Sequence, residues 1–228
     1  MASALVFGGL GAIGDATAIA LERGGFVVTR TARGTQQGAL HVDPVGAPET
    51  LAALDKLPPL SAVVWAQGAN VNDSAADVET QALRDVLDAN VTFVAATLQR
   101  LLVADRLAAP ARLVVISSIW EQIARPGKYS YTISKAAVGG LVRAASADLA
   151  ASGHLINAVL PSVTDTPMTR SMLSDEQVTR VAGSTGFQRL TSLDDVAQTA
   201  AWLASDANTG VTGQAIAVDL GFSHVRSL

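Results

Sequence analysis

The sequence predicts a single domain with a doubly wound α/β fold, in which helices cover both faces of a parallel sheet of about seven strands. Short apolar, β-prone runs alternate with alanine-rich helical stretches along all 228 residues. The apolar runs have no alternating polar face, which is typical of strands that are buried on both sides. No proline-rich or low-complexity linker interrupts the pattern, so residues 1–228 are expected to form one domain.

The expected strands and helices follow one another in the order that repeated β-α units require. The strands are Ala4–Phe7, Phe26–Arg30, Ala39–Val42, Ala62–Ala66, Leu113–Ser117, Ile156–Leu160 and Ala215–Val218. The helices are Ile13–Arg23, Pro48–Leu57, Thr80–Leu107, Tyr131–Ala151 and Leu193–Ala204. Residues 162–188 are polar and contain Pro167, Gly183 and Gly186, and we expect this long connection to form a substrate lid.

The composition narrows the class of function. Hydrophobic residues make up 49% and charged residues 16%, so part of the surface is expected to meet a cofactor or another subunit. The net charge of -4, without a long basic run, argues against nucleic acid as a partner. The absence of cysteine excludes disulfide and zinc-thiolate chemistry, and no metal site is expected. No N-terminal signal or membrane-spanning apolar run stands out, so we expect a cytoplasmic protein without a membrane partner.

Three glycines lie directly after the first expected strand and before the first expected helix. Gly8, Gly11 and Gly14 stand at three-residue spacing. Glycines at this position permit a tight turn and let backbone N–H groups approach a pyrophosphate at the helix N-terminus. Such turns are also common without a ligand, but the position in the first β-α turn favours a dinucleotide site.

A second group of residues carries the equipment for proton transfer. Ser118 precedes a Tyr-x-x-x-Lys pair, Tyr131 and Lys135. If this pair is helical, the two side chains lie one turn apart on one face, and the lysine favours ionisation of a phenol whose ordinary pKa is about 10. A nearby serine hydroxyl can polarise a carbonyl group. Taken singly, a tyrosine at an element boundary or a helical lysine has a structural explanation at least as often.

These features together resemble the short-chain dehydrogenase/reductase family over nearly the full chain. VFGGLGAIG resembles that family's glycine loop, and Asn90 in LDANVTF matches its active-site asparagine. Ser118, Tyr131 and Lys135 match its serine and Tyr-x-x-x-Lys motif. PSVTDTPM, from Pro161, resembles the segment that contacts the nicotinamide, and TGQAIAVDLGFS resembles the closing strand and turn. The resemblance implies a Rossmann fold and a homo-oligomer, either a tetramer or a dimer.

The resemblance also implies a role for each catalytic residue. Tyr131 exchanges a proton with the substrate oxygen, and Lys135 lowers the pKa of Tyr131 and binds the ribose hydroxyls. Ser118 donates a hydrogen bond to the carbonyl oxygen, and Asn90 holds a water that links Lys135 to solvent. The sequence departs from the family at Phe7, where threonine is usual, and at WAQG, which replaces an Asn-Ala-Gly run.

The end of the second strand favours NADP(H) over NAD(H). It reads VVTRTARGTQ, without the acidic residue that binds a ribose 2′-hydroxyl, and Arg30 and Arg33 suit a 2′-phosphate. The alternative is that these arginines only solvate a loop. Asp43 resembles the family's adenine contact, although it could simply begin a turn. The expected cofactor contacts are Gly8, Gly11, Ile13, Gly14, Arg30, Arg33, Asp43, Gln67, Gly68, Tyr131, Lys135, Pro161, Val163 and Thr166.

The substrate is expected to lie against residues 119–130 and the lid. The apolar candidates are Trp120, Met168, Met172 and Phe187, and the polar ones are Glu121, Gln122, Arg125 and Lys128. Packing and surface solvation explain these residues as readily as substrate contact does. The function expected is an NADPH-dependent carbonyl reductase or alcohol dehydrogenase that acts on a small molecule. The alternatives are a dehydratase or epimerase on the same scaffold and a non-catalytic cofactor-sensing protein.

Overall fold

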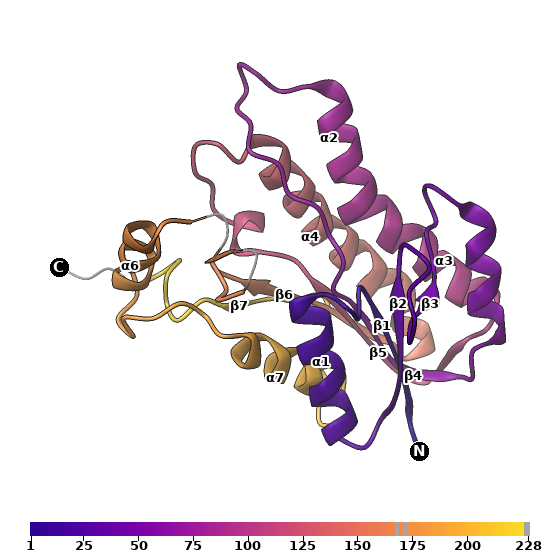
Figure 1. The fold of residues 1–228 in the computed structure, drawn as a ribbon. Coiled ribbons are helices and arrows are strands. Elements are labelled where there is room, and N and C mark those ends of the chain that lie inside the picture. Colours follow the sequence, from indigo (N-terminus) through magenta and orange to yellow (C-terminus); the bar gives the residue numbers. More distant parts are fainter. Residues whose placement is uncertain (167–168, 171–172, 226–228) are drawn as a thin grey trace.

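The computed structural model describes residues 1–166, 169–170 and 173–225 of the chain and contains one parallel sheet (Figure 1). Its strand order is β3-β2-β1-β4-β5-β6-β7. The strands are β1 (Ser3–Phe7), β2 (Val27–Ala32), β3 (Leu40–His41), β4 (Leu60–Trp65), β5 (Leu107–Ile116), β6 (Leu155–Pro161) and β7 (Ala215–Val218). This is the doubly wound fold that the sequence predicts. The order reverses between β1 and β4, and ligands bind at the carboxyl ends of strands on either side of such a reversal.

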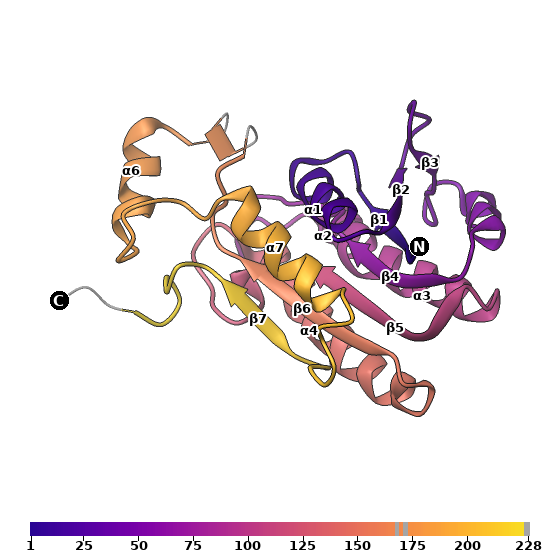
Figure 2. The ribbon, with the colours of Figure 1, turned by 90° about the horizontal axis from the view of Figure 1, so that it is seen from below.

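Helices cover both faces of the sheet (Figures 1 and 2). On one face lie α1 (Ala12–Arg23) and α7 (Leu193–Leu203), and on the other lie α2 (Thr80–Leu87), α3 (Phe93–Val103) and α4 (Tyr129–Leu149). Short helical turns are η1 (Pro48–Lys56), η3 (Ile119–Glu121) and η4 (Ala150–Ser152). Alternate residues of β1 enter the two hydrophobic cores, Leu5 on the α3 and α4 side and Val6 on the α1 and α7 side. Burial on both faces explains why β1, β4 and β6, near the middle of the sheet, are almost continuously apolar.

Two departures from the family pattern pack against each other. Phe7, at the end of β1, stacks on Trp65, at the end of β4, with ring centroids 5.6 Å apart. Phe93 meets the Phe7 ring edge-on at 5.5 Å. The indole Nε1 of Trp65 donates a hydrogen bond of 2.8 Å to Thr97 Oγ1 in α3. All three rings are buried, so the aromatic group ties the two central strands to the helix layer.

The expected helix Thr80–Leu107 is interrupted and ends earlier than predicted. A π-helical turn, Asp88–Thr92, lies between α2 and α3, and Asn90 sits inside it. The chain leaves α3 after Val103, and β5 already begins at Leu107 rather than at Leu113. Periodicity cannot distinguish a π turn from an α-helix because the polar and apolar pattern continues through it. Such turns are frequent at functional sites.

The expected lid contains a helix that the sequence interpretation missed. Within residues 162–188, α6 (Asp175–Gly183) begins at a capping box. Ser174 Oγ accepts a hydrogen bond from Gln177 N, and Ser174 N donates to Gln177 Oε1. A serine followed three residues later by glutamine signals a helix start, so this helix could have been predicted. Both views place α6 apart from the two helix layers, at the β7 end of the sheet (Figures 1 and 2).

The apolar character of residues 80–103 bears on the expectation that no run spans a membrane. Residues 80–103 are long and apolar enough, by length and composition, to cross a membrane, although the sequence interpretation found no such run. Phe93, Val94, Leu98 and Leu101 of this helix belong to the buried core against the sheet. A core helix passes the same test of length and composition, so the result carries no membrane assignment.

Candidate active site

Ser118, Tyr131 and Lys135 come together just beyond the carboxyl end of β5. Ser118 precedes η3 and accepts a hydrogen bond from Trp120 N at 3.4 Å. Tyr131 and Lys135 lie one turn apart in the first part of α4. Lys135 Nζ donates a hydrogen bond of 3.2 Å to the carbonyl oxygen of Ile116 in β5 and lies 5.5 Å from the centroid of the Tyr131 ring. The structure therefore places the motif residues as a compact group.

Burial dominates the ionisation of this group. Desolvation raises the pKa of Tyr131, and the neighbouring Ser118 hydroxyl opposes this rise. Desolvation also lowers the pKa of Lys135 to about 8, an effect that the charge of Glu121 opposes. Burial thus outweighs any lowering of the Tyr131 pKa in this structure, and the expected effect of Lys135 on Tyr131 stays a prediction. A buried site disfavours both charged forms, and the phenol is protonated at neutral pH.

Asn90 connects the π turn to the other elements of the site. Its Nδ2 donates to Ala69 O at 3.0 Å and to Ser134 Oγ at 2.9 Å, and its Oδ1 accepts from Ala69 N at 2.8 Å. A Cβ at Gly68 would lie 2.8 Å from Asn90 Oδ1 and 3.9 Å from Lys135 Nζ. Gly68 therefore permits the loop after β4 to approach both side chains.

The glycine loop forms a tight turn before α1. Gly8 has a φ of +69°, and a Cβ there would lie 2.8 Å from Gln67 N. A Cβ on Gly14 would lie 2.1 Å from Gly8 O, so neither position tolerates a side chain without movement. Gly11 N donates to Gly8 O at 2.9 Å, and Gly11 is the N-cap of α1. Ile13, in the first turn of α1, is partly buried against the core on the α1 and α7 side of the sheet.

The surroundings of the turn fit a dinucleotide. The N-terminus of α1 is presented without a capping side chain, as a pyrophosphate site requires. Beside it, the amide nitrogen and oxygen of Gln67 are both buried without a hydrogen-bond partner among the described residues. Buried polar atoms normally have partners, and a bound ligand could supply them.

Arg30, in β2, and Arg33, just after it, differ in their surroundings. Arg30 Nη1 pairs with Glu22 Oε1 at 2.5 Å, and Arg30 Nε lies 3.4 Å from Asp15 Oδ1. Arg33 is exposed and has no carboxylate within salt-bridge distance in the described parts of the chain. Asp43 Oδ1 accepts hydrogen bonds from the backbone of the turn that follows it, at 3.4 Å from Val45 N and 3.0 Å from Gly46 N. The carboxylate of Asp43 thus stabilises a turn. This is the role that the sequence allowed as the alternative to an adenine contact.

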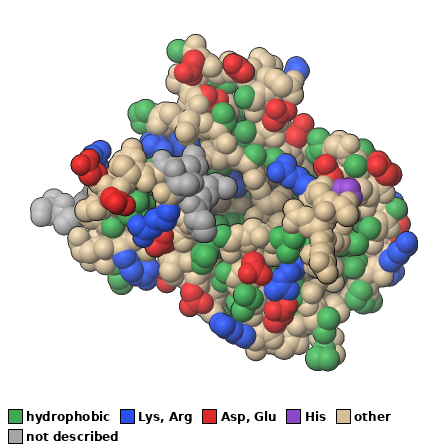
Figure 3. Space-filling model, in the orientation of Figure 1, with side chains coloured by type: hydrophobic (Ala, Val, Ile, Leu, Met, Phe, Trp, Pro, Cys, Tyr) green, Lys and Arg blue, Asp and Glu red, His purple; other side chains and the backbone are tan. Residues whose placement is uncertain are grey.

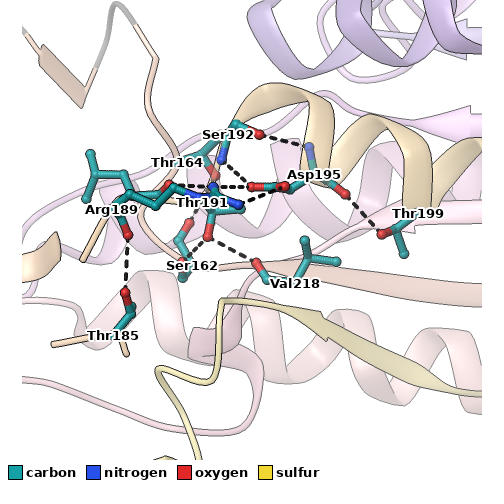
Figure 4. Close-up of polar contacts among 10 residues, drawn as sticks. Ser162, Thr164, Thr185, Arg189, Thr191, Ser192, Asp195, Thr199 and Val218 are labelled. Atoms are coloured by element: carbon teal, nitrogen blue, oxygen red, sulfur yellow. Dashed lines mark hydrogen bonds and ion pairs between the residues drawn. The ribbon is translucent and has the colours of Figure 1, made fainter. Parts of the chain in front are cut away.

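The expected lid leaves and returns to the sheet at one place (Figure 4). Ser162 follows β6, and its hydroxyl lies 2.6 Å from Thr191 Oγ1, just before α7. Thr164 pairs with Thr191 in an isolated parallel bridge. The segment is therefore a long loop whose two ends are held together.

An ion pair supports the returning end of this loop. Arg189 Nη1 lies 2.6 Å from Asp195 Oδ2 in the first turn of α7, and Asp195 also accepts a hydrogen bond from Ser192 N (Figure 4). These contacts, led by the hydrogen bond from Arg189, lower the pKa of Asp195 to about 2. The segment expected to be a lid is thus held by an ion pair near its returning end and by serine and threonine hydroxyls where it leaves the sheet.

The other residues expected to contact cofactor or substrate near the lid have different surroundings. Pro161 ends β6 beside Val218, Val163 is partly buried, and Thr166 Oγ1 accepts from Thr169 N at 3.0 Å. Met168 and Met172 lie outside the described residues. Phe187 is 66% exposed, so in this structure it does not pack within the core.

Residues 119–130, where the substrate is expected to lie, bring charged side chains as well as the apolar Trp120 to the site. Figure 3 shows a hollow near the centre of the face seen in Figure 1, below α2. Trp120 is partly buried, and the Arg125 guanidinium lies 5.6 Å from its ring centroid. Lys128 is buried, and its Nζ lies 5.6 Å from the Tyr131 ring centroid. Sequence reasoning treated Lys128 as equally consistent with an exposed residue, and the structure excludes that.

Glu121 points into the protein rather than toward solvent. Its Oε1 lies 2.5 Å from the place that a Cβ on Gly139 would occupy, and its Oε2 is buried without a hydrogen-bond partner among the described residues. Burial raises the pKa of Glu121, while Ser117, Arg143 and Lys135 oppose that rise. A glycine pair in mid-helix, at residues 139–140, was the available signal that something packs closely against α4.

Known proteins match this chain in sequence. A family model described as Enoyl-(Acyl carrier protein) reductase matches residues 47–223. A cis-4-hydroxycyclohexanecarboxylate dehydrogenase from Sinomonas cyclohexanicum is 34% identical over 149 residues, which cover 65% of this chain and 59% of that protein. The 3-oxoacyl-[acyl-carrier-protein] reductase FabG of Staphylococcus aureus is 33% identical over 137 residues, covering 60% and 55%. The matches thus span little more than half the length of these relatives.

Solved structures match the fold over almost its full length. A short chain dehydrogenase family protein from Francisella tularensis superposes with a TM-score of 0.89 at 24% identity, covering 99% of this chain and all of the other. ElxO with NADP bound gives the same TM-score at 21% identity, covering 98% and 99%. The fold, the grouped motif residues and the family match over more than half of the chain agree, and the protein belongs to the short-chain dehydrogenase/reductase family.

Proposed function

We propose that the protein is an NADP(H)-dependent carbonyl reductase or alcohol dehydrogenase. The observation that carries this proposal is the grouping of Ser118, Tyr131 and Lys135 beside a loop that fits a dinucleotide. A bound nicotinamide supplies or accepts the hydride, because no side chain can do so. The chain's own residues then have to bind the substrate oxygen and move one proton.

Tyr131 is the proposed proton donor to the substrate oxygen during reduction. Its pKa is raised by burial, so the phenol carries the proton that this step requires. Ser118 lies close enough to influence Tyr131 and can donate a hydrogen bond to the same oxygen as negative charge develops there. Lys135 holds its ammonium against β5 and places positive charge behind the phenol. Asn90 keeps the loop after β4 and the start of α4 in register.

The NADP(H) preference rests mainly on Arg33. Arg33 is exposed and free of carboxylate partners among the described residues, whereas Arg30 already neutralises Glu22 and Asp15. A guanidinium suits a 2′-phosphate by charge and by its paired N–H groups. ElxO, which shares the fold, is named as binding NADP, and this supports a nicotinamide cofactor rather than the preference itself. The glycine loop and Gln67 would hold the remainder of the cofactor.

The substrate class proposed is a ketone or the corresponding secondary alcohol. The two relatives are named for a ring hydroxyl and for a 3-oxoacyl group, both of which belong to this class. A dehydratase or epimerase on the same scaffold would retain its cofactor unchanged through turnover. A cofactor-sensing protein would need no proton donor at residue 131. Stoichiometric oxidation of NADPH by a ketone separates these alternatives from the reductase.

The central test is substitution of Tyr131. A panel of ketones is screened by nicotinamide absorbance, and Tyr131→Phe is expected to lower kcat by at least about 10³-fold because the proton donor is lost. NADPH binding, measured by fluorescence titration, should stay within about threefold of the wild type. Near-normal turnover by the variant would contradict the assignment of Tyr131 as the acid.

Assembly and location are part of the same proposal. We expect a homo-oligomer, tetramer or dimer, in the cytoplasm, acting on a small molecule. Exposed apolar side chains on α4, Tyr129 at 43% and Ile133 at 36%, support burial against another subunit. Light scattering measures the assembly, and a monomer at micromolar concentration would contradict it.

A further inference from the structure

Lys128 is a buried ammonium placed beside the proposed proton donor. It is 5% exposed, and its Nζ lies 5.6 Å from the centroid of the Tyr131 ring, nearly the distance of Lys135 Nζ at 5.5 Å. The two lysines near the Tyr131 ring have different hydrogen-bond partners. Lys135 bonds to β5, and Lys128 bonds to the loop that follows β4.

The hydrogen bonds of Lys128 go to neutral groups only. Nζ donates to Asn70 Oδ1 at 2.8 Å and to Asn72 Oδ1 at 2.6 Å, and both acceptors are neutral amides. An ammonium has three N–H donors, so these two bonds leave one for a further acceptor. No carboxylate lies within 4.0 Å of Lys128 among the described ion pairs, which instead involve arginines.

The neighbouring charges compensate Lys128 only in part, because no carboxylate among the described ion pairs contacts its ammonium. Asp73 favours the charged form of Lys128 from a distance, but its oxygens accept hydrogen bonds from Ser130 N, at 3.0 Å, and from Ser130 Oγ. Arg125 adds a second positive charge nearby and disfavours the ammonium, as burial does. Burying a charge without a counter-ion costs free energy, which an anionic ligand beside it would recover.

We propose that Lys128 is an anion anchor for the substrate, which is therefore a ketone or secondary alcohol that also carries a carboxylate. This inference rests on the proposed function. The carboxylate would accept the third N–H of Lys128, and the carbonyl would face Tyr131 and Ser118. Asn70 and Asn72 hold the ammonium in place, because they fix two of its three donors.

A purely structural role is the competing explanation. Lys128 could act only as a clasp between the loop after β4 and the start of α4. The same two segments are already joined by Asp73 and Ser130. A clasp is damaged when either partner is removed, whereas an anion anchor depends on the charge. Lys128→Met removes the charge, and Asn72→Ala removes one acceptor while the charge stays.

The first experiment measures binding without turnover. Calorimetry with NADP⁺ present compares matched carboxylates and amides: cyclohexanecarboxylate, benzoate and hexanoate with their uncharged amides. The wild type should bind at least one acid about tenfold more tightly than its amide, within the range of a charged hydrogen bond. Lys128→Met should bring this ratio close to one. Asn72→Ala should keep a clear preference for the acid, and Lys56→Met, a substitution at an exposed lysine, should keep the full ratio.

Several results would contradict the role of Lys128 as an anion anchor. Equal binding of acid and amide by the wild type, the lack of measurable binding by every acid, or an acid preference that survives in Lys128→Met each overturns the anchor. Equal loss of the preference in Lys128→Met and Asn72→Ala would identify a clasp instead. Thermal unfolding of each variant verifies that the folded protein is being compared.

A second experiment separates this inference from the proposed function. Keto acids and their amides are compared as substrates by kcat/KM, using NADPH. If neutral ketones are reduced but keto acids show no advantage, the anchor fails and the reductase stands. If acids bind with dependence on Lys128 but no carbonyl compound is reduced, the reductase fails and the anion site stands.

Discussion

At the scale of single residues, burial rather than pairwise charge controls the site. Tyr131 and Lys135 are one turn apart, which suggested that the ammonium would ionise the phenol. In the folded protein, desolvation raises the pKa of Tyr131 and lowers that of Lys135 to about 8. Both side chains are thus biased toward their neutral forms, and the protonated phenol suits reduction.

Lys135 should make stability depend on pH in the alkaline range. Its folded pKa of about 8 lies below the ordinary 10.5, so between these values the unfolded chain binds more protons than the folded chain. The free energy of unfolding should therefore rise with pH in this window, by up to about 2 kcal/mol between pH 8 and 10. Urea denaturation measures the rise, and Lys135→Met should remove it. If the free energy of unfolding fell equally steeply with rising pH in the wild type and in Lys135→Met, the lowered pKa of Lys135 would be contradicted.

Arg30, in β2, and Arg33, just after it, should respond differently to substitution. Arg33→Gln is expected to weaken NADPH binding by about 10-fold or more and to leave NADH binding nearly unchanged, because only the 2′-phosphate needs this cation. Arg30→Gln is the matched comparison and should affect both cofactors alike, since Arg30 already pairs with Glu22 and Asp15. Fluorescence titration gives both dissociation constants. Loss of the preference for NADPH in Arg30→Gln alone would reverse the assignment.

At the scale of elements, the site depends on interruptions of regular structure. The π turn at Asp88–Thr92 brings Asn90 to Ala69 and Ser134, so three elements meet through one side chain. The loop at residues 162–191 departs and returns beside Thr191. Contacts at its two ends hold the loop to the sheet, and its role as a substrate lid stays a prediction.

The anchor at Asp195 should weaken in acid. Its pKa of about 2 in the folded protein lies below the ordinary 3.8, so the contribution is complete above pH 3.8 and is lost as pH falls toward 2. The pair is partly exposed, so solvent screening keeps its contribution to holding the returning end of this loop small. Hydrogen exchange of the lid amides should therefore quicken about fivefold in Asp195→Asn at neutral pH. Asp165→Asn breaks a more exposed pair within the lid and should change exchange much less. Unchanged lid exchange in Asp195→Asn would show that the hydroxyl contacts suffice.

At the scale of the whole molecule, the two helix layers and the sheet form a frame that holds the chemistry in place. Phe7, Trp65 and Phe93 fill the space between β1, β4 and α3, directly below the carboxyl ends where the glycine loop and the loop after β4 begin. Phe7 and Trp65, the two residues that differ from the family pattern here, thus pack against each other. This packing replaces polar family residues by stacked rings and leaves the motif residues in position.

The stability of this frame should depend strongly on Trp65. Trp65→Ala is expected to lower the free energy of unfolding by about 3–5 kcal/mol, because it removes a fully buried ring and leaves a cavity. Trp65→Phe keeps an aromatic ring against Phe7 but loses the hydrogen bond to Thr97, and should cost about 1–2 kcal/mol. Denaturant unfolding measures both. A smaller loss for the alanine variant than for the phenylalanine variant would contradict this account of the core.

The sequence by itself determined the fold class, most strand positions and the order of the motif residues. These depend on short-range patterns: continuous apolar runs for Ala4–Phe7 or Ile156–Leu160, and fixed spacing for Tyr131 and Lys135. The capping box before α6 was also legible, though it was overlooked.

Only the tertiary structure decided what surrounds each charged group. Arg30 is neutralised by Glu22, Glu121 packs against Gly139, and Lys128 is held by Asn70 and Asn72. Asn70 and Asn72 lie more than fifty residues from Lys128 in the chain. Desolvation and long-range pairing depend on which elements pack together. A local sequence pattern does not show which elements these are. The physical state of the site was therefore decided by the fold, although its residues could be named from the sequence.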